Sequence, residues 1–141
     1  MKNTMIALLT FLLPLSAFAD FQDCMQFVGK WVTIPNAYYT YSRFEISFDA
    51  SHIVLIYPDQ NNHSIVLIPD GVTHPGVDPN WEGTQYTLTC APTSMVLVRN
   101  LTLLVAPLKS EFKVINNQLI YTDTVTGFKP QTMGVFNKVI L

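Results

Sequence analysis

Apolar and polar residues alternate along much of this chain, which is the pattern of β-strands that bury one face. In residues 38–49, Phe44, Ile46 and Phe48 fall on one face, and charged or hydroxyl side chains fall on the other. Residues 84–91 alternate in the same way. Both stretches are therefore predicted to form half-buried strands.

Shorter apolar runs, separated by turn-forming residues, predict the other strands. A short helical turn or arm is expected at 20–27, and residues 69–83 and 124–131 are expected to be loops. Asn116 and Asn117 fit a tight hairpin turn, because asparagine tolerates positive φ. A first strand through Trp31 should end at Pro35. Further strands are expected at 53–57, 64–68, 95–99, 101–105, 111–115, 118–123 and 133–141, with one long bent strand over 95–105 as the alternative to two separate ones.

About nine or ten short strands at this spacing, without a helical period, are typical of a sandwich or a barrel. A closed barrel hides the edges of its sheet, and an up-and-down order needs only short connections between strands. We therefore predict an all-β fold: a single antiparallel up-and-down β-barrel of about eight to ten strands.

The first nineteen residues have the features of a signal peptide. Lys2 precedes an apolar run, and Ala17-Phe18-Ala19 fits the small-residue rule for cleavage. The run is shorter than the roughly 20 residues that a membrane-spanning helix needs. The expected organisation is a signal peptide at 1–19 and one domain at 20–141, exported to the periplasm or secreted, with no membrane span after removal of the signal.

Export affects how the two cysteines are interpreted. Cys24 and Cys90 are the only cysteines, and an oxidising compartment favours a disulfide between them. Neither belongs to a C-x-x-C motif, so redox catalysis has no support. We expect the disulfide to tie the N-terminal arm to a strand in the middle of the chain.

Charge and motif content exclude several functions. Without Lys2, the chain has seven Lys and Arg and ten Asp and Glu. The basic residues are scattered singly along the sequence, so no basic patch is available for nucleic acid. The chain has no G-x-S-x-G motif, no free cysteine that could act with a histidine and no paired carboxylates, so an enzyme is not expected. His52, His63 and His74 match no compact metal motif, and neither a metal nor another cofactor is expected.

Gly29-Lys30-Trp31, followed by a series of hairpins, resembles the start of the lipocalin-like barrels of the calycin superfamily, in the compact form of exported bacterial proteins. In that superfamily the Trp of a G-x-W motif packs across the closed end of the barrel beneath a basic residue from near the C-terminus. Lys138 matches that basic residue, and Thr122-Asp123-Thr124 partly matches a second signature. The resemblance implies a structural barrel end made by Gly29, Trp31 and Lys138, and a small hydrophobic ligand such as a lipid or fatty acid.

The barrel interior is the expected ligand site if it is hollow, although a chain of this size could equally fill it with side chains. Tyr39 lies in a tyrosine cluster expected near the barrel mouth, and Trp81 in the 69–83 loop could act as a lid, anchor a partner or simply pin the loop. The interior residues expected to contact a ligand are Phe44, Ile46, Phe48, Tyr86, Leu88, Phe112 and Val114.

Two functions are consistent with these features. The first is an exported protein that binds a small hydrophobic molecule. The alternative is a periplasmic or secreted protein-interaction domain, similar to protease-inhibitor barrels, that acts on an envelope or secreted protein through its N-terminal arm at 20–27 and the 69–83 loop.

Overall fold

The structure is a computed structural model that describes residues 22–33, 43–49, 51–57, 61, 63–76, 84–101, 104 and 106–140. The expected signal peptide at 1–19 and two of the expected ligand contacts, Tyr39 and Trp81, lie outside these residues.

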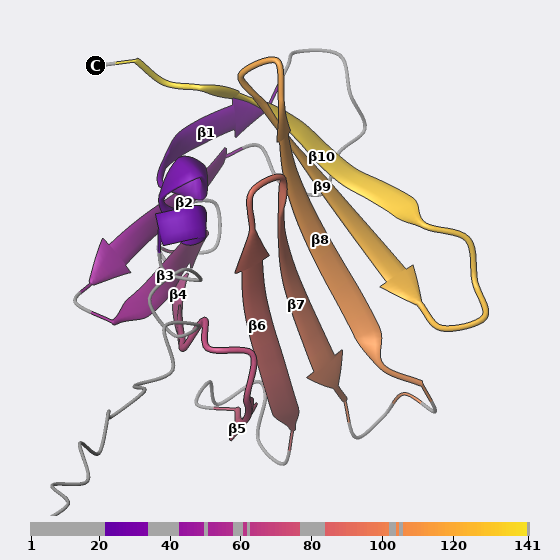
Figure 1. The fold of residues 1–141 in the computed structure, drawn as a ribbon. Coiled ribbons are helices and arrows are strands. Elements are labelled where there is room, and N and C mark those ends of the chain that lie inside the picture. Colours follow the sequence, from indigo (N-terminus) through magenta and orange to yellow (C-terminus); the bar gives the residue numbers. More distant parts are fainter. Residues whose placement is uncertain are drawn as a thin grey trace, which may run out of the picture.

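The described chain forms ten strands in one antiparallel sheet (Figure 1). Strands that follow one another in sequence lie side by side, except that β4 and β5 are at opposite edges, and β1 also pairs with β10. The order across the sheet is β4-β3-β2-β1-β10-β9-β8-β7-β6-β5. The predicted all-β, up-and-down fold is confirmed. The strands are β1 (Gly29–Thr33), β2 (Arg43–Asp49), β3 (His52–Tyr57), β4 (His63–Leu67), β5 (Thr73–Pro75), β6 (Gln85–Ala91), β7 (Ser94–Asn100), β8 (Leu108–Ile115), β9 (Gln118–Val125) and β10 (Gln131–Lys138).

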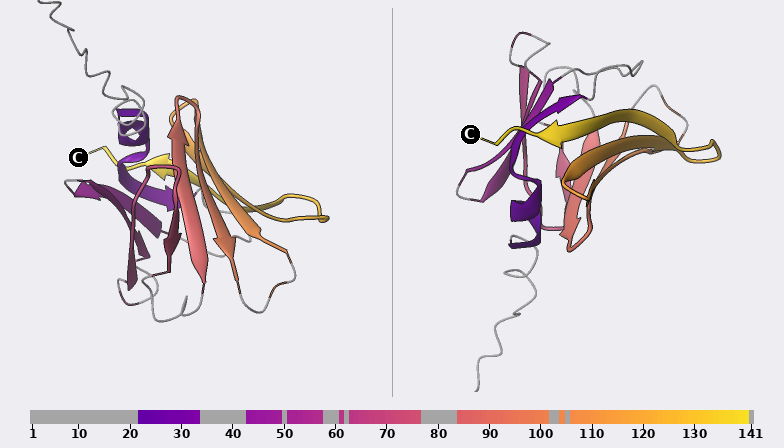
Figure 2. Two further views of the ribbon diagram at one scale, coloured as in Figure 1. Left: turned by 60° about the horizontal axis from the view of Figure 1, so that its bottom comes forward. Right: turned by 90° about the horizontal axis from the view of Figure 1, so that it is seen from above.

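The sheet curls into a half-barrel, so that β1–β4 face β6–β10 across the core (Figures 1 and 2). The two halves join through the β1–β10 pairing, and among the described residues the ladder ends at β4 on one side and at β5 on the other. The segment between β4 and β5 crosses toward β6, where the Gly71 N–H donates to the Leu88 carbonyl at 3.0 Å. The segment thus connects the two edge strands, β4 and β5, which would pair with each other in a fully closed barrel.

Several predicted boundaries are wrong. Leu101 and Leu104 lie in no strand, and the Leu104 N–H donates to the Leu101 carbonyl at 3.0 Å. The other residues of the strand predicted at 101–105 lie outside the described residues. β5 lies inside the predicted 69–83 loop, because its three residues pair with β6. β9 extends to Val125 and β10 begins at Gln131, so the loop between them is shorter than predicted, and β10 ends at Lys138.

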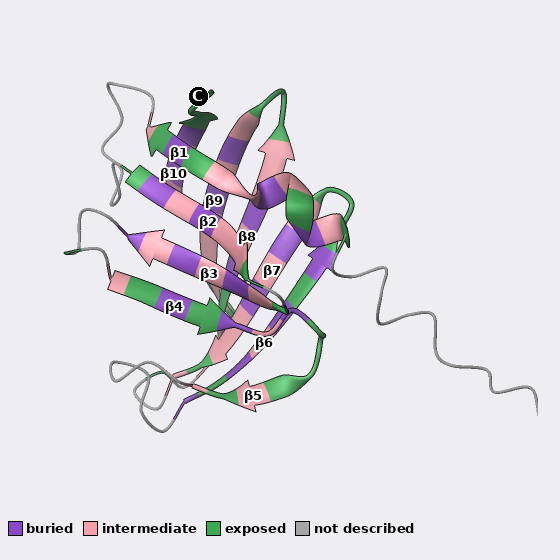
Figure 3. Ribbon diagram, turned by 90° about the vertical axis from the view of Figure 1, so that its left-hand side faces the viewer, coloured by how far each residue is buried: buried purple, intermediate pink, exposed green. Residues whose placement is uncertain are grey.

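The core consists of the alternate residues that point inward from both halves (Figure 3). Phe44 of β2 and Phe112 of β8 stack with ring centroids 5.6 Å apart, so the two halves of the sheet are in contact at these rings. Tyr121 stacks on Phe112 at 4.6 Å, and Tyr57 and Phe136 pack against Phe44. Aromatic rings therefore fill the interior at this level.

One end of the half-barrel is closed by a short helical turn, η1 (Met25–Phe27), as expected for the arm. Cys24 and Phe27 are fully buried, and the structure contains the Cys24–Cys90 disulfide. The Gln26 side-chain amide donates to the Ala91 carbonyl at 3.0 Å. These contacts tie η1 to the turn between β6 and β7.

Trp31 packs beneath this closure. Its side chain is 1% exposed, and its indole N–H donates to the Phe27 carbonyl at 3.0 Å. This acceptor removes the cost of burying the indole N–H without a hydrogen bond. The Lys138 ammonium lies 5.4 Å from the ring centroid, within the range of a cation–π contact.

Gly29 allows Lys138 to reach that ring. We expect Gly29→Ala to lower the free energy of unfolding by about 1–3 kcal/mol, because Gly29 has a φ of +152°, which a side chain disfavours. An added Cβ would also lie 2.7 Å from Lys138 Cε, so the lysine would have to shift from Trp31. Urea unfolding measures the loss.

Gly127→Ala is a matched control, because Gly127 also has positive φ (+91°) but an added Cβ there would meet no other part of the chain within 4 Å. A loss for Gly29→Ala that is no greater than for Gly127→Ala contradicts the steric part of the explanation. The double variant Gly29→Ala, Lys138→Ala should recover that part.

The crossing segment between β4 and β5 is held by a cluster of polar side chains and one ring contact. His74 Nε2 lies 2.9 and 3.0 Å from the two carboxylate oxygens of Asp70. The His74 ring packs on Tyr86 at 5.6 Å, and the Tyr86 hydroxyl accepts the Ile68 N–H at 3.1 Å. Part of the predicted loop is thus anchored to β6.

Asp70 is expected to make stability depend on pH. Burial raises the pKa of its carboxyl, but hydrogen bonds from the Val72 N–H and from His74 outweigh burial and lower the pKa overall. The stabilisation is therefore complete above the unfolded pKa of about 4 and is lost as pH falls through the lowered folded pKa. Asp70→Asn should cost less than about 1 kcal/mol at neutral pH, since the pair is exposed.

Urea unfolding of wild type and Asp70→Asn at several pH values measures this contribution. The difference between the two proteins should shrink as the solution is acidified. A difference that stays constant down to the acid end of the range contradicts the assignment to Asp70 ionisation.

Candidate ligand-binding site

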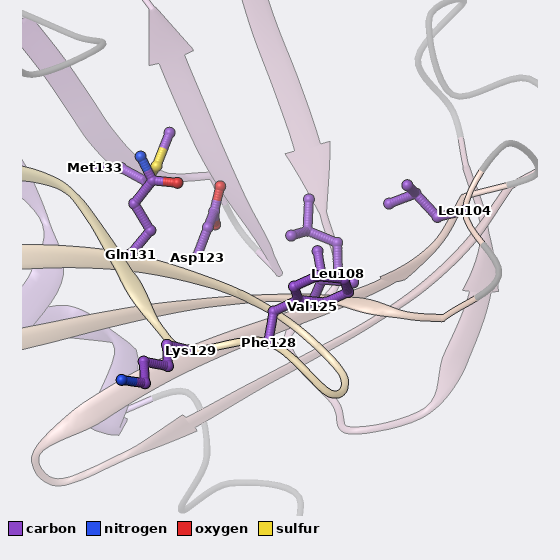
Figure 4. Close-up of a pocket in the computed structure, with 8 residues that line it drawn as sticks. All are labelled: Leu104, Leu108, Asp123, Val125, Phe128, Lys129, Gln131 and Met133. Carbon is purple, nitrogen blue, oxygen red and sulfur yellow. The ribbon is translucent and has the colours of Figure 1, made fainter.

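A pocket of about 560 Å³ opens near Leu108, at the start of β8. The helical turn η1, which closes the other end, contacts β8 and the turn beside Ala91. The register pairs Ser94, next to that turn, with Lys113 near the far end of β8. The pocket therefore lies toward the end of the half-barrel opposite the closure, and we call it the mouth pocket. Its lining residues are Leu104, Leu108, Asp123, Val125, Phe128, Lys129, Gln131 and Met133 (Figure 4).

The apolar wall of the mouth pocket comes from β8, β9 and the hairpin between β9 and β10. The Phe128 N–H donates to the Val125 carbonyl at 2.9 Å, and Gly127 has positive φ, so the chain turns sharply and presents Phe128. Phe128 is 75% exposed. The register shifts between Thr132 and Gly134, and this irregularity places Met133 against the core. A large apolar side chain in this open position is available to a ligand.

A polar network borders the apolar wall. Ser110 is 1% exposed and donates from Oγ to Asp123 Oδ1 at 2.6 Å. The Tyr121 hydroxyl donates to Asp123 Oδ2 at 3.1 Å, and an Arg99 guanidinium nitrogen donates to Ser110 Oγ at 3.0 Å. These side chains share the inner face because residues two apart on each strand point the same way. Of the four, only Asp123 lines the mouth pocket.

Tyr121 serves in this network as a proton donor. Burial raises the pKa of its hydroxyl far above the ordinary value, and the nearby Tyr57 and the Asp123 carboxylate raise it further. The phenol therefore keeps its proton at any physiological pH. Its hydrogen bond to Asp123 is therefore not lost through ionisation of the phenol.

The predicted ligand contacts that the structure describes belong to the core or pack against it. None of them lines the mouth pocket. Phe44 borders a second hollow, of about 360 Å³, beside Trp31 and Arg43. The buried residues are Phe44, Ile46, Tyr86, Leu88 and Phe112, and the partly buried ones packed against them are Phe48 and Val114.

Sequence reasoning missed the lining of the mouth pocket, although one signal was present. Tyr121 and Asp123 share one face of a strand that is otherwise apolar on that side. A charged residue on an inward face needs partners, and that requirement points to a polar site. Leu108 was missed because the strand was predicted to begin at residue 111, three residues later than β8 does.

Within the described ranges, no three His, Cys, Asp or Glu side chains gather closely enough to hold a metal ion. The helices described there are too short or too polar to cross a membrane.

The fold resembles that of a known fluorescent protein. The crystal structure of wild-type UnaG matches this chain with a TM-score of 0.59 and 10% sequence identity, covering 82% of this chain and 99% of UnaG. A UnaG variant with one substitution matches with a TM-score of 0.58 and the same identity, covering 83% and 99%. No family model and no curated protein matches the sequence. The structural match to UnaG confirms the expected calycin-like β-barrel fold.

Proposed function

We propose that this chain is an exported binding protein, not an enzyme, for a small molecule with a hydrophobic body. The observation that carries the proposal is the mouth pocket, which has mainly apolar side chains and a few polar groups. Its volume of about 560 Å³ is within the range of small-molecule sites. The calycin-like fold supports the same function.

The ligand enters at the mouth pocket and lies against Leu108, Val125 and Phe128. Phe112 and the other predicted contacts that the structure describes belong to the core and do not line the pocket. A lipid or a fatty acyl chain fits the apolar wall.

Export to the periplasm or the exterior is part of the proposal. It is supported by the signal features of residues 1–19 and by the Cys24–Cys90 disulfide, which an oxidising compartment maintains. The mature chain would then be the domain at 20–141.

The burial of Cys24 and Phe27 in the N-terminal arm favours ligand binding over a role as a protein inhibitor. Cys24 and Phe27 of the arm are fully buried, and Gln26 is bonded to Ala91. A segment that completes the core is poorly available to a partner protein. An envelope or secreted protein partner is therefore the second candidate.

The test is native mass spectrometry of the mature protein purified from its own exported compartment, followed by organic extraction and lipid analysis. We expect one small hydrophobic molecule per chain. Leu108→Trp should reduce its occupancy by filling the mouth pocket, whereas Val66→Trp, at a position 42% exposed on β4, should not. A protein that is empty in repeated preparations and binds no added hydrophobic probe would overturn the proposal.

A further inference from the structure

We infer that the mouth pocket selects amphiphiles whose polar group donates hydrogen bonds, an amine above all and a hydroxyl next, over carboxylates such as fatty acids. This inference rests on the proposed function and names the ligand class. The group that recognises the ligand is Asp123, at the polar edge of the apolar wall.

The hydroxyl protons near Asp123 are already used within the protein. A serine or tyrosine hydroxyl has one proton to donate. The proton of Ser110 goes to Oδ1 of Asp123, and the proton of Tyr121 goes to Oδ2. These two hydroxyls therefore have no proton for a ligand carboxylate.

The Asp123 carboxylate can still accept. An ionised carboxylate offers about four acceptor positions, and Ser110 and Tyr121 occupy one on each oxygen. Asp123 is half-buried and lines the pocket. The group presented to a ligand is thus a negatively charged acceptor, which attracts an ammonium or a hydroxyl and repels a carboxylate.

The cations of this region do not reverse that preference. Arg99 donates to Ser110 and does not line the mouth pocket. Lys129 does line it, but the residue is exposed, and Figure 4 shows its nitrogen directed away from Leu108 and Val125. Asp123 is thus the half-buried charged residue of the lining, whereas Lys129 is exposed.

The preference can be measured with three probes that share one chain: decylamine, decanol and decanoate. Each displaces the neutral dye N-phenyl-1-naphthylamine from the mature, disulfide-bonded protein at pH 7. We expect decylamine to bind at least about tenfold more tightly than decanoate, with decanol between them, because a charged hydrogen bond is the stronger kind.

Asp123→Asn should reduce the ratio of decylamine to decanoate affinity by about tenfold and leave decanol nearly unchanged. Asp49→Asn is the matched control: it removes the same charge from an exposed residue at the end of β2 and should preserve the ratio. Lys129→Gln should leave decylamine binding within about twofold, since the exposed cation does not hold the amine.

Equal or tighter binding of decanoate by the wild type overturns the ligand class, while the proposed function stands because the pocket still binds. An unchanged ratio of decylamine to decanoate affinity in folded Asp123→Asn also overturns the ligand class. If Asp123→Asn does not fold, the wild-type series decides. Failure of the dye and all three probes to bind overturns both the ligand class and the proposed function.

Discussion

Replacing Trp31 with alanine is expected to lower the free energy of unfolding by about 3–5 kcal/mol, the usual cost of truncating a buried aromatic side chain. Trp31 is 1% exposed and fills the space beneath η1. The substitution also leaves the Phe27 carbonyl without its indole donor and Lys138 without its ring. Urea unfolding followed by far-ultraviolet circular dichroism measures the loss without depending on tryptophan fluorescence.

Val32→Ala is the control, because Val32 is the next residue of the same strand and is 40% exposed. It should change stability by less than about 1 kcal/mol. A loss below about 1 kcal/mol for Trp31→Ala would falsify the view that this residue closes the barrel end, since a buried aromatic costs more.

Removing the disulfide with the double variant Cys24→Ala, Cys90→Ala is expected to cost about 2–5 kcal/mol. The bridge joins residues 66 positions apart. Constraining a loop of that length in the unfolded chain is worth about 4 kcal/mol by closure entropy alone. The loss should appear as a lower midpoint of urea unfolding.

A reductant provides the control for this variant. It should destabilise the wild type by a similar amount and leave the double variant unchanged, because only the wild type has a bond to reduce. Equal stability of the oxidised wild type and the double variant contradicts the stabilising role of the bridge. If η1 detaches in the variant, the Trp31 side chain should also become more accessible to quenchers, because its indole N–H is bonded to the Phe27 carbonyl of η1.

Much of the fold was predictable because its signals are local. Strict alternation in β2 and β6 determines which side chains point inward, and the Asn116-Asn117 turn has positive φ at both residues, as the hairpin requires. The strand predicted to include Leu101 and Leu104 was wrong at these two residues for a non-local reason. Both are apolar, but β8 pairs with β7 only from Leu108 onward, so both lie outside the ladder.

The candidate site was less predictable than the fold. Phe44 and Phe112 were correctly placed on inward faces, yet only packing decides whether such residues line a cavity or fill it. Here their rings stack across the interior. The mouth pocket depends on the β9–β10 hairpin and on the register irregularity near Met133, neither of which leaves a periodic signal.

The sequence by itself determined the strand pattern and the all-β class, because both depend on residue type and short spacing. It also determined the disulfide partners, because the chain has only two cysteines. The barrel-end role expected for Gly29, Trp31 and Lys138 came from the resemblance to a known superfamily. Only the tertiary structure decided that the ladder runs from β4 to β5 as a half-barrel, and that Arg99, Ser110, Tyr121 and Asp123 form one network. Those residues come from three strands. Their meeting follows from the curl and register of the sheet, which pairing between distant segments sets and no local pattern encodes.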